Sequence, residues 1–173
     1  VATERSAFAV AQNIDTFALV NQQVIQWTEH YYVNGIDPGS VGSLNATSRQ
    51  QFAEAFVRWQ QGDVPFSQAE GLDGLIQLLT PTFGPVRAEL IASTEVTRVF
   101  TQATLLAEAN NPYTVAYRFQ TSADERVCPI CSPLNQQTTP KSSSGFGDFG
   151  WPPLHPRCRC SISIETEQTL RHG

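Results

Sequence analysis

The sequence predicts an α+β protein in which a mainly helical body is followed by a small β-containing module at the C-terminus. Two observations lead to this prediction. Apolar residues recur at helical spacing through most of residues 1–110, as in amphipathic helices that share a core. Residues 111–165 instead contain short alternating runs, a long loop and all four cysteines of the chain. We expect residues 166–173 to form a tail that is either frayed or helical.

Composition and charge restrict the classes of protein to consider. The chain has 173 residues, 40% of them hydrophobic, which is enough for a core. Residues 1–110 carry a net charge of −6 and residues 111–173 a net charge of +1. An acidic body argues against broad electrostatic binding of nucleic acid, which needs clustered Lys and Arg. No apolar run is long enough to span a membrane, and we expect no signal peptide. Because the chain has no methionine, we expect it to be a piece or a processed product of a longer one.

The first two helices are expected at residues 7–33 and from Thr47 or Ser48 to Gly62-Asp63. Asn34-Gly35 is a favourable stop for the first helix, and a loop should follow it. The residues expected to face the core are Ile14, Phe17, Val24, Trp27 and Tyr31 in the first helix and Phe52, Ala55, Phe56 and Trp59 in the second.

A short third helix and a long fourth helix should complete the body. Ser67 and Glu70 have the spacing of a capping box, and the segment from Pro81 to Pro85 should end the third helix. Pro85 suits the first position of the fourth helix, which we expect to run to about residue 109. The residues expected to face the core are Leu72, Leu75, Ile76 and Leu79 in the third helix and Val86, Leu90, Ile91, Thr94, Val99 and Leu105 in the fourth.

Two strands are expected after the helical body. Val115, Tyr117 and Phe119 alternate with more polar residues, and the segment from Cys160 to Ile164 alternates in the same way. Residues 132–153 lie between these runs and are rich in Pro, Ser and Gly, so we expect little regular structure there. A loop of this length in a compact domain needs something that holds its ends together, and the cysteines lie at those ends.

Five candidate metal ligands occur in two groups, namely Cys128 and Cys131 in the first and His155, Cys158 and Cys160 in the second. Two cysteines three residues apart can direct both thiolates at one ion, and Cys158 and Cys160 would face the same side of a strand. Zinc takes four nitrogen or sulfur ligands in a tetrahedron. The spacing therefore predicts one zinc ion held by four cysteines or by three cysteines and His155, and it leaves open which donor is left over.

The predicted site is structural rather than catalytic. A closed set of four ligands leaves no position for water, so the ion would have no Lewis-acid chemistry. We expect residues 132–153 to bury little apolar surface, so that metal binding supplies the energy that fixes this loop. There are two alternatives. One is a pair of disulfides, each joining a cysteine of the first group to a cysteine of the second. The other is four free thiols, with His155 hydrogen-bonded in a turn.

Other polar groups are weaker functional candidates. Glu95 and Arg98 are three apart in the fourth helix, where an ion-paired helix face is the simpler interpretation and an enzyme site of the nuclease or transferase type is the alternative. The segment from Asp124 to Arg126 is expected either to support the metal ligands or to form a solvated turn. A nucleic-acid-binding zinc module would use Arg126, Trp151, Arg157 and Arg159. We expect no catalytic residue and no small-molecule substrate.

Two segments together resemble the phage Mu F-like head morphogenesis family, the minor head proteins of tailed phages. Residues 87–98, RAELIASTEVTR, are similar to the "RAxxIAxTE" helix of that family, with Ser93 where the family often has arginine. Residues 124–131, DERVCPIC, and 152–160, PPLHPRCRC, are similar to its terminal signature. The resemblance covers roughly residues 45–165.

The resemblance implies a structural component of the virion. Proteins of that family are minor capsid proteins that associate with the portal and the interior of the head and serve assembly or DNA delivery. It implies the portal protein, other capsid proteins and perhaps packaged DNA as partners, without a membrane. The expected location is the portal-proximal interior of the capsid, and the host cytoplasm during assembly.

Overall fold

The computed structural model of the protein describes residues 22–28, 30–31, 46–60, 72–122 and 127–172. Residues 22–28 and 30–31 are helical. The other helices are α2 (Ala46–Gln60), α3 (Leu72–Phe83), α4 (Pro85–Glu108) and α5 (Glu167–His172). The strands are β1 (Ala116–Gln120), β2 (Thr138–Pro140) and β3 (Ser161–Glu165), and two 3₁₀ helices cover Ser132–Leu134 and Gly147–Phe149. The mainly helical body and the small C-terminal sheet confirm the predicted α+β class.

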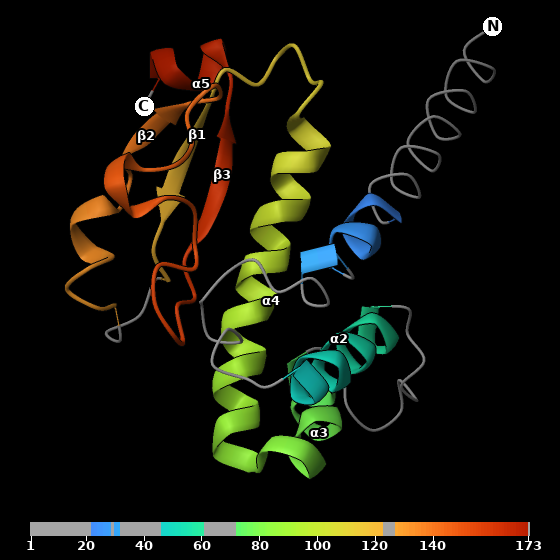
Figure 1. The fold of residues 1–173 in the computed structure, drawn as a ribbon. Helices are drawn as coiled ribbons and strands as arrows, with labels where there is room; N and C mark the ends of the chain where they lie inside the picture. The colour runs from blue at the N-terminus through green and yellow to red at the C-terminus, as the bar shows by residue number, and fades with distance from the viewer. Residues whose placement is uncertain (1–21, 29, 32–45, 61–71, 123–126, 173) are drawn as a thin grey trace, which may run out of the picture.

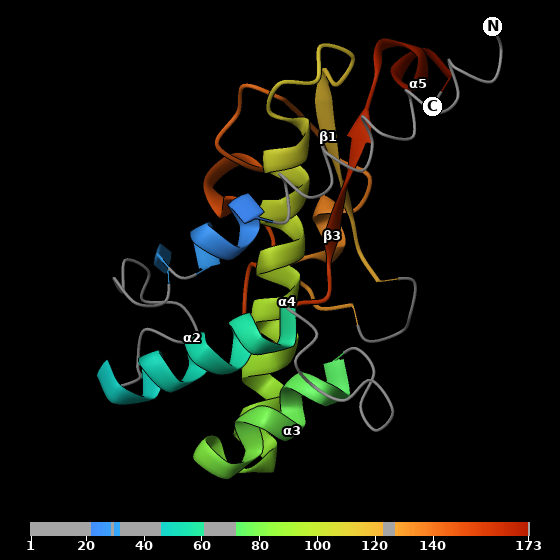
Figure 2. The same ribbon diagram turned by 90° about the vertical axis from the view of Figure 1, so that its right-hand side faces the viewer.

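Helix α4 stands between the two halves of the fold (Figures 1 and 2). Helices α2 and α3 pack against its N-terminal half, and the sheet lies along its C-terminal half. Pro85 occupies the first turn of α4, where its missing N–H costs nothing. The preceding Gly84 has a φ of 75°, a conformation that glycine adopts without strain. This corner turns the chain back on itself, so that α3 and α4 lie side by side.

The body core matches most of the predicted helix faces. Its buried members are Val24, Phe52, Ala53, Phe56, Leu75, Leu79, Ala88, Ile91, Ala92 and Val99. Phe56 contacts Phe52 and Trp59 through their rings, at centroid distances of 5.5 and 5.3 Å. Aromatic side chains supply a large share of the buried apolar area in such a core, so these three residues hold α2 against its neighbours.

Two predictions about residues that face the core were wrong. Val86 is 71% exposed and Leu72 is 37% exposed, because each lies at the first turn of its helix, beyond the edge of the core. The segment from Pro81 to Pro85 ends the third helix as predicted, since α3 ends at Phe83. Pro81 itself lies in the last turn of α3, where the Gly84 amide donates to the Thr80 carbonyl.

Several predictions concern residues outside the described part of the chain. These are residues 7–21 of the first helix, the stop at Asn34-Gly35, the end of the second helix, the capping box of Ser67 and Glu70, and the segment from Asp124 to Arg126. Within the described part of the first helix, Val24 is buried and Trp27 and Tyr31 pack against the body core, as the apolar stripe predicts.

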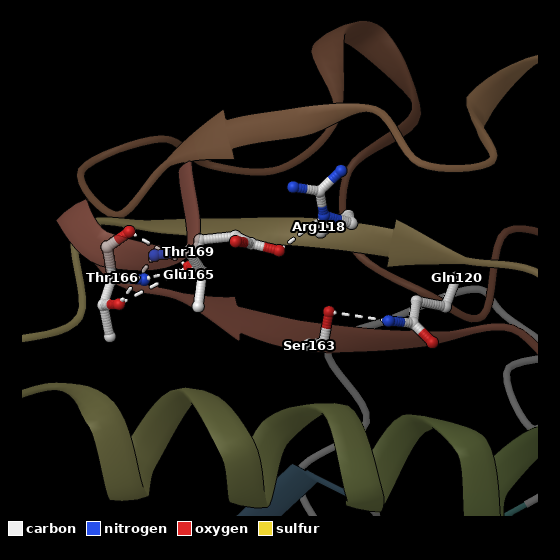
Figure 3. A network of polar contacts seen from close by, with 6 residues as sticks. All are labelled: Arg118, Gln120, Ser163, Glu165, Thr166 and Thr169. Atoms are coloured by element: carbon white, nitrogen blue, oxygen red, sulfur yellow. Dashed lines mark hydrogen bonds and ion pairs between the residues drawn. The ribbon is translucent and has the colours of Figure 1, made fainter. Parts of the chain in front are cut away.

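The sheet has the strand order β2-β1-β3, and both pairings are antiparallel. Strand β1 pairs with β3 from Ala116 opposite Glu165 to Gln120 opposite Ser161. Polar side chains link these strands on one face (Figure 3): Gln120 donates to the Ser163 hydroxyl at 2.8 Å, and Arg118 forms an ion pair with Glu165. The predicted alternation therefore holds for β1 and β3, although Ile164 is 41% exposed, since it lies near the end of β3.

The loop of residues 132–153 is more ordered than the sequence predicts. It contains β2 and both 3₁₀ helices. Thr139 donates to the carbonyl of Gly145, and Gly145 is required because a Cβ atom there would lie 2.3 Å from the carbonyl carbon of Gly150. Short polar turns give no periodic signal, so β2 could not be recognised from the sequence.

The module also has a hydrophobic core of its own, which contradicts the expectation that its loop buries little apolar surface. Phe146 contacts Phe119 edge-on at 5.1 Å between ring centroids, and Trp151 contacts Tyr117 and Phe146 at 5.4 and 5.6 Å. Perpendicular rings at these distances are a favourable arrangement. The core is completed by Leu134, Ile162 and three of the cysteines.

Helix α5 begins directly after β3 and accounts for most of the predicted tail. The Thr166 hydroxyl accepts a hydrogen bond from the Thr169 amide, and the Thr169 hydroxyl accepts one from the Thr166 amide (Figure 3). This reciprocal pair satisfies two amides at the start of the helix, in the manner of a capping box. None of the helices in the described ranges has the length and apolar character needed to cross a membrane.

The Arg118–Glu165 pair predicts a specific acid sensitivity. The hydrogen bond from Arg118 lowers the pKa of Glu165 below its usual 4.5, so the carboxylate stabilises the fold above that pH and loses this effect as pH falls through the lowered value. In urea titrations, we expect Glu165→Gln to be less stable than wild type at about pH 7 and to approach wild type at about pH 3. A constant difference across this pH range would contradict the assignment, and comparison at each pH cancels the acid response of other groups.

Candidate metal centre

The pairing of β1 with β3 brings the two groups of candidate ligands together. Cys128 and Cys131 follow β1, and His155, Cys158 and Cys160 precede β3. Because the strands are antiparallel, the end of β1 lies opposite the start of β3, with Gln120 facing Ser161. Segments that are far apart in sequence therefore enter and leave the sheet at the same end.

The five candidate donors form two overlapping groups of three. Cys128, Cys131 and His155 make one group, and Cys131, Cys158 and Cys160 make the other, with donor atoms within 4.8 Å of one another in each. His155 Nε2 lies 3.0 Å from Cys128 Sγ and 3.3 Å from Cys131 Sγ, and the Sγ atoms of Cys131 and Cys158 are 3.9 Å apart. All four cysteines are free thiols, so the arrangement does not contain the disulfides weighed from the sequence.

The first cysteine pair has the local geometry of a metal knuckle. The Cys131 amide donates to Cys128 Sγ at 3.3 Å, and the Ser132 amide donates to the Cys128 carbonyl at 3.0 Å. The turn directs backbone N–H groups toward the sulfur, and such groups stabilise a thiolate. Burial raises the pKa of Cys128, but these hydrogen bonds outweigh it and the net shift is downward.

The His155 ring is oriented by the backbone next to it. Its Nδ1 donates to the Pro156 carbonyl at 2.8 Å, because a carbonyl can only accept. In the neutral ring this leaves Nε2 without a proton and directed at the thiols, which is the usual arrangement of a histidine that binds a metal. Burial acts to lower the pKa of His155, but the Pro156 carbonyl and the neighbouring thiolates more than offset it, so the pKa is raised.

The remaining three thiols lie close together in a buried site, and they shift one another's pKa values. The hydrogen bond from Cys160 lowers the pKa of Cys158 to about 5 despite its burial. Burial, reinforced by Cys128 and Cys158, raises the pKa of Cys131 to about 12. The pKa of Cys160 is raised in turn by Cys158 and by burial. Several thiolates can coexist there only with a cation among them, since like charges at this spacing repel strongly in a poorly solvated site.

Two threonines of α4 attach the second ligand group to the helix. Thr94 is 2% exposed, and its hydroxyl donates to the Leu90 carbonyl and accepts from the Arg157 amide, both at 2.8 Å. The Thr97 hydroxyl donates to the Cys158 carbonyl at 2.8 Å. Arg157 has a backbone φ of 61°, which is unfavourable for residues other than glycine. The hydrogen bond to Thr94 helps to hold this turn between His155 and Cys158.

The other functional candidates from the sequence analysis make contacts of a structural kind. Glu95 is 1% exposed and forms an ion pair with Arg98 at 3.0 Å, which confirms the predicted pairing, although the carboxylate is buried. Trp151 belongs to the module core. The Arg157 guanidinium lies 3.7 Å from Glu89, and both side chains are more than half exposed, so this contact contributes little.

Sequence reasoning missed the role of the threonines. Thr94 was placed in the apolar stripe of its helix, where it does lie, and Thr97 was not singled out. The available signal was a helix face with threonines at positions 94, 97, 101 and 104. Hydroxyls at helical spacing on a buried face need partners outside the helix or at its own carbonyls.

Comparison with known proteins gives one result. The family model described as "Phage Mu protein F like protein" matches residues 68–163, which is more than half of the chain. The match spans α4, the module core and all five candidate ligands. No curated protein and no solved structure matches the chain significantly.

The Thr94 contact is testable by an isosteric substitution. Thr94→Val keeps the shape and leaves the Arg157 amide without its acceptor, so we expect a loss of about 1–3 kcal/mol in the free energy of unfolding. Thr104→Val is the matched control, because the Thr104 hydroxyl bonds only to the Phe100 carbonyl of its own helix; a change within about 0.5 kcal/mol is expected. Equal losses in urea titrations of the two variants would rule out the anchoring role.

Proposed function

Because the chain belongs to the phage Mu protein F-like family, we propose that it is a structural minor head protein of a tailed phage. We propose further that it lies in the interior of the head near the portal, contacts the portal protein and other capsid proteins, and serves assembly or DNA delivery. The observation that supports this proposal is the family match over residues 68–163. The motif helix and the Cys/His cluster, which carry the resemblance, contact each other directly in the structure.

The Cys/His cluster is proposed to bind one structural zinc ion through Cys128, Cys131, His155 and Cys158. Bonds of about 2.3 Å to sulfur and 2.0–2.1 Å to nitrogen place the ligand atoms of a tetrahedral site about 3.5–3.8 Å apart. The separations of 3.0, 3.3 and 3.9 Å among these four residues are close to that range. Thiolates and imidazole are also the donor types that zinc prefers.

Cys160 is the donor proposed to remain outside the first coordination shell. It lies within 4.8 Å of Cys131 and Cys158 but shares no such group with Cys128 or His155. Cys158 shares no such group with them either, but its charge acts on His155, and the His155 charge acts on Cys158, so we propose Cys158 as the fourth ligand. As a neutral thiol, Cys160 would donate a hydrogen bond to the ligand sulfurs, a common role for residues next to a metal site.

The proposed ion would act on the fold rather than in catalysis. It would join the end of β1 to the turn that α4 holds through Thr94 and Thr97, and so fix the module on the helix. Zinc binding in small domains contributes on the order of 10 kcal/mol, and here it would add to an aromatic core that already exists. Four protein ligands leave no open position on the ion for a substrate, so we assign no catalytic residue.

The ligand assignment predicts different outcomes for two cysteine variants. Purified wild-type protein should contain about one zinc ion per chain by elemental analysis. We expect Cys131→Ser, which removes the residue common to both groups, to abolish retained zinc, and Cys160→Ser to keep it with an affinity lower by about 10–100-fold. Loss of zinc in Cys160→Ser together with retention in His155→Ala would instead assign the site to the four cysteines. Wild-type protein that binds no zinc would refute the proposal.

The location is testable in particles of the phage that encodes the chain. We expect the protein in purified virions at low copy number and, after lysine- and carboxylate-directed cross-linking with mass spectrometry, cross-links to the portal protein. Cross-links confined to the major capsid protein would contradict the portal-proximal position. Absence of the protein from mature particles and from assembly intermediates would contradict the structural role.

A further inference from the structure

A cleft lies beside the metal centre, between the helical body and the module. Its volume is about 700 Å³, within the range of about 300–1,000 Å³ that is typical of binding sites. It is lined by Trp27 and Tyr31, by one side of α4, by Ser144 and by the segment from Phe149 to Pro156. Its lining includes Trp27, Tyr31, Arg98, Gln102, Phe149 and Trp151, and we refer to this site as the aromatic cleft.

Both walls of the aromatic cleft are built from aromatic rings in fixed positions. On one side Trp27 stacks on Tyr31 at 4.8 Å between centroids, and the Arg98 guanidinium lies 5.5 Å from the Tyr31 ring. On the other side Trp151 is held edge-on by Tyr117 and Phe146. Phe149, at the rim, is 55% exposed. Rings that are already ordered lose little freedom when a ligand binds.

The charged residues that line the cleft do not favour an ionic ligand. Among the described lining residues, Arg98 and His155 are the two that can carry positive charge near neutral pH. Arg98 is ion-paired with the buried Glu95, and His155 faces the thiols. Binding of single-stranded nucleic acid requires a positively charged groove in addition to stacking aromatics, and the cleft does not offer one.

The shape and polar groups of the cleft match an extended peptide. The lining residues of α4 run from Thr94 to Leu105, a length of about 16 Å at 1.5 Å per residue. A polyproline II segment of about five residues has the same length at 3.1 Å per residue. Its carbonyls have no internal partners, so side-chain donors such as the Gln102 amide and the two indoles can bind them. Grooves lined by aromatic residues recognise such segments in other proteins.

We propose that the aromatic cleft binds an uncharged, proline-containing segment of a partner protein in a polyproline II conformation. The proposal goes beyond the virion assignment and does not depend on it, since it rests on the lining residues alone. The candidate metal centre and the cleft both include His155, whose Nε2 faces the thiols, so the two sites adjoin.

Indole NMR signals of the full chain provide the test. The chain has three tryptophans: Trp27 and Trp151 line the cleft, whereas Trp59 packs on Phe56 in the body core and serves as the internal control. The probe is a pool of uncharged decapeptides with proline at every third position and Tyr, Leu or Ala between. The comparison probes are the same pool with glycine in place of proline and a ten-nucleotide oligothymidine. We expect the proline pool to shift the Trp27 and Trp151 signals and leave Trp59 unchanged.

A pair of matched variants tests the site itself. Phe149→Ala should weaken binding of the best peptide by about fivefold or more, as removal of an interface aromatic commonly does, without loss of folding, because Phe149 lies outside the core. Tyr113→Ala removes another exposed ring, 76% accessible, which does not line the cleft, and should have no effect. The proposal is overturned if no proline peptide shifts the two signals, if the oligonucleotide shifts them instead, or if both variants weaken binding equally.

Discussion

The attachment of the Cys/His turn to α4 is the constraint on which the C-terminal half of the protein depends. Thr94 and Thr97 bind the backbone of Arg157 and Cys158 across more than sixty residues of sequence. The turn that carries three of the candidate metal ligands is thereby fixed on a helix that also contributes to the body core. Both hydrogen bonds are to backbone groups, so they specify the path of the chain rather than a particular side chain.

The sheet supplies the second half of the same constraint. Antiparallel pairing of β1 with β3 brings Cys128 and Cys131 to the end of the sheet where that turn begins. The fold itself therefore brings the candidate ligands close together without a bound ion. The aromatic core of Phe119, Phe146 and Trp151 fixes the loop that connects the two groups of ligands. A site assembled in this way needs less reorganisation to bind a metal than the folding-coupled site of an isolated zinc peptide.

The sequence predicted the parts of this arrangement that depend on local patterns. Helical periodicity identified α2, α3 and α4, and the cysteine and histidine spacing identified the five candidate ligands that the structure brings together. The sequence could not predict β2. This strand has three residues, paired with a strand about twenty positions earlier in the chain, and so short a segment shows no alternation of apolar and polar residues. The module core was also missed, since Phe146 and Trp151 are isolated aromatics in a Gly- and Pro-rich segment and become neighbours only through tertiary packing.

The family motif in α4 also contains neighbouring residues whose partners are set by tertiary packing. Thr94 and Glu95 are adjacent in sequence, but their side chains have different partners: Thr94 binds the Cys/His turn, and Glu95 pairs with Arg98 beneath the aromatic cleft. Both side chains are buried, and an unpartnered polar group in either position would be costly. One short stretch of helix thus supports both the candidate metal centre and the aromatic cleft, which Thr94 and Arg98 line. A requirement to satisfy both at once accounts for buried polar residues at these positions of the helix.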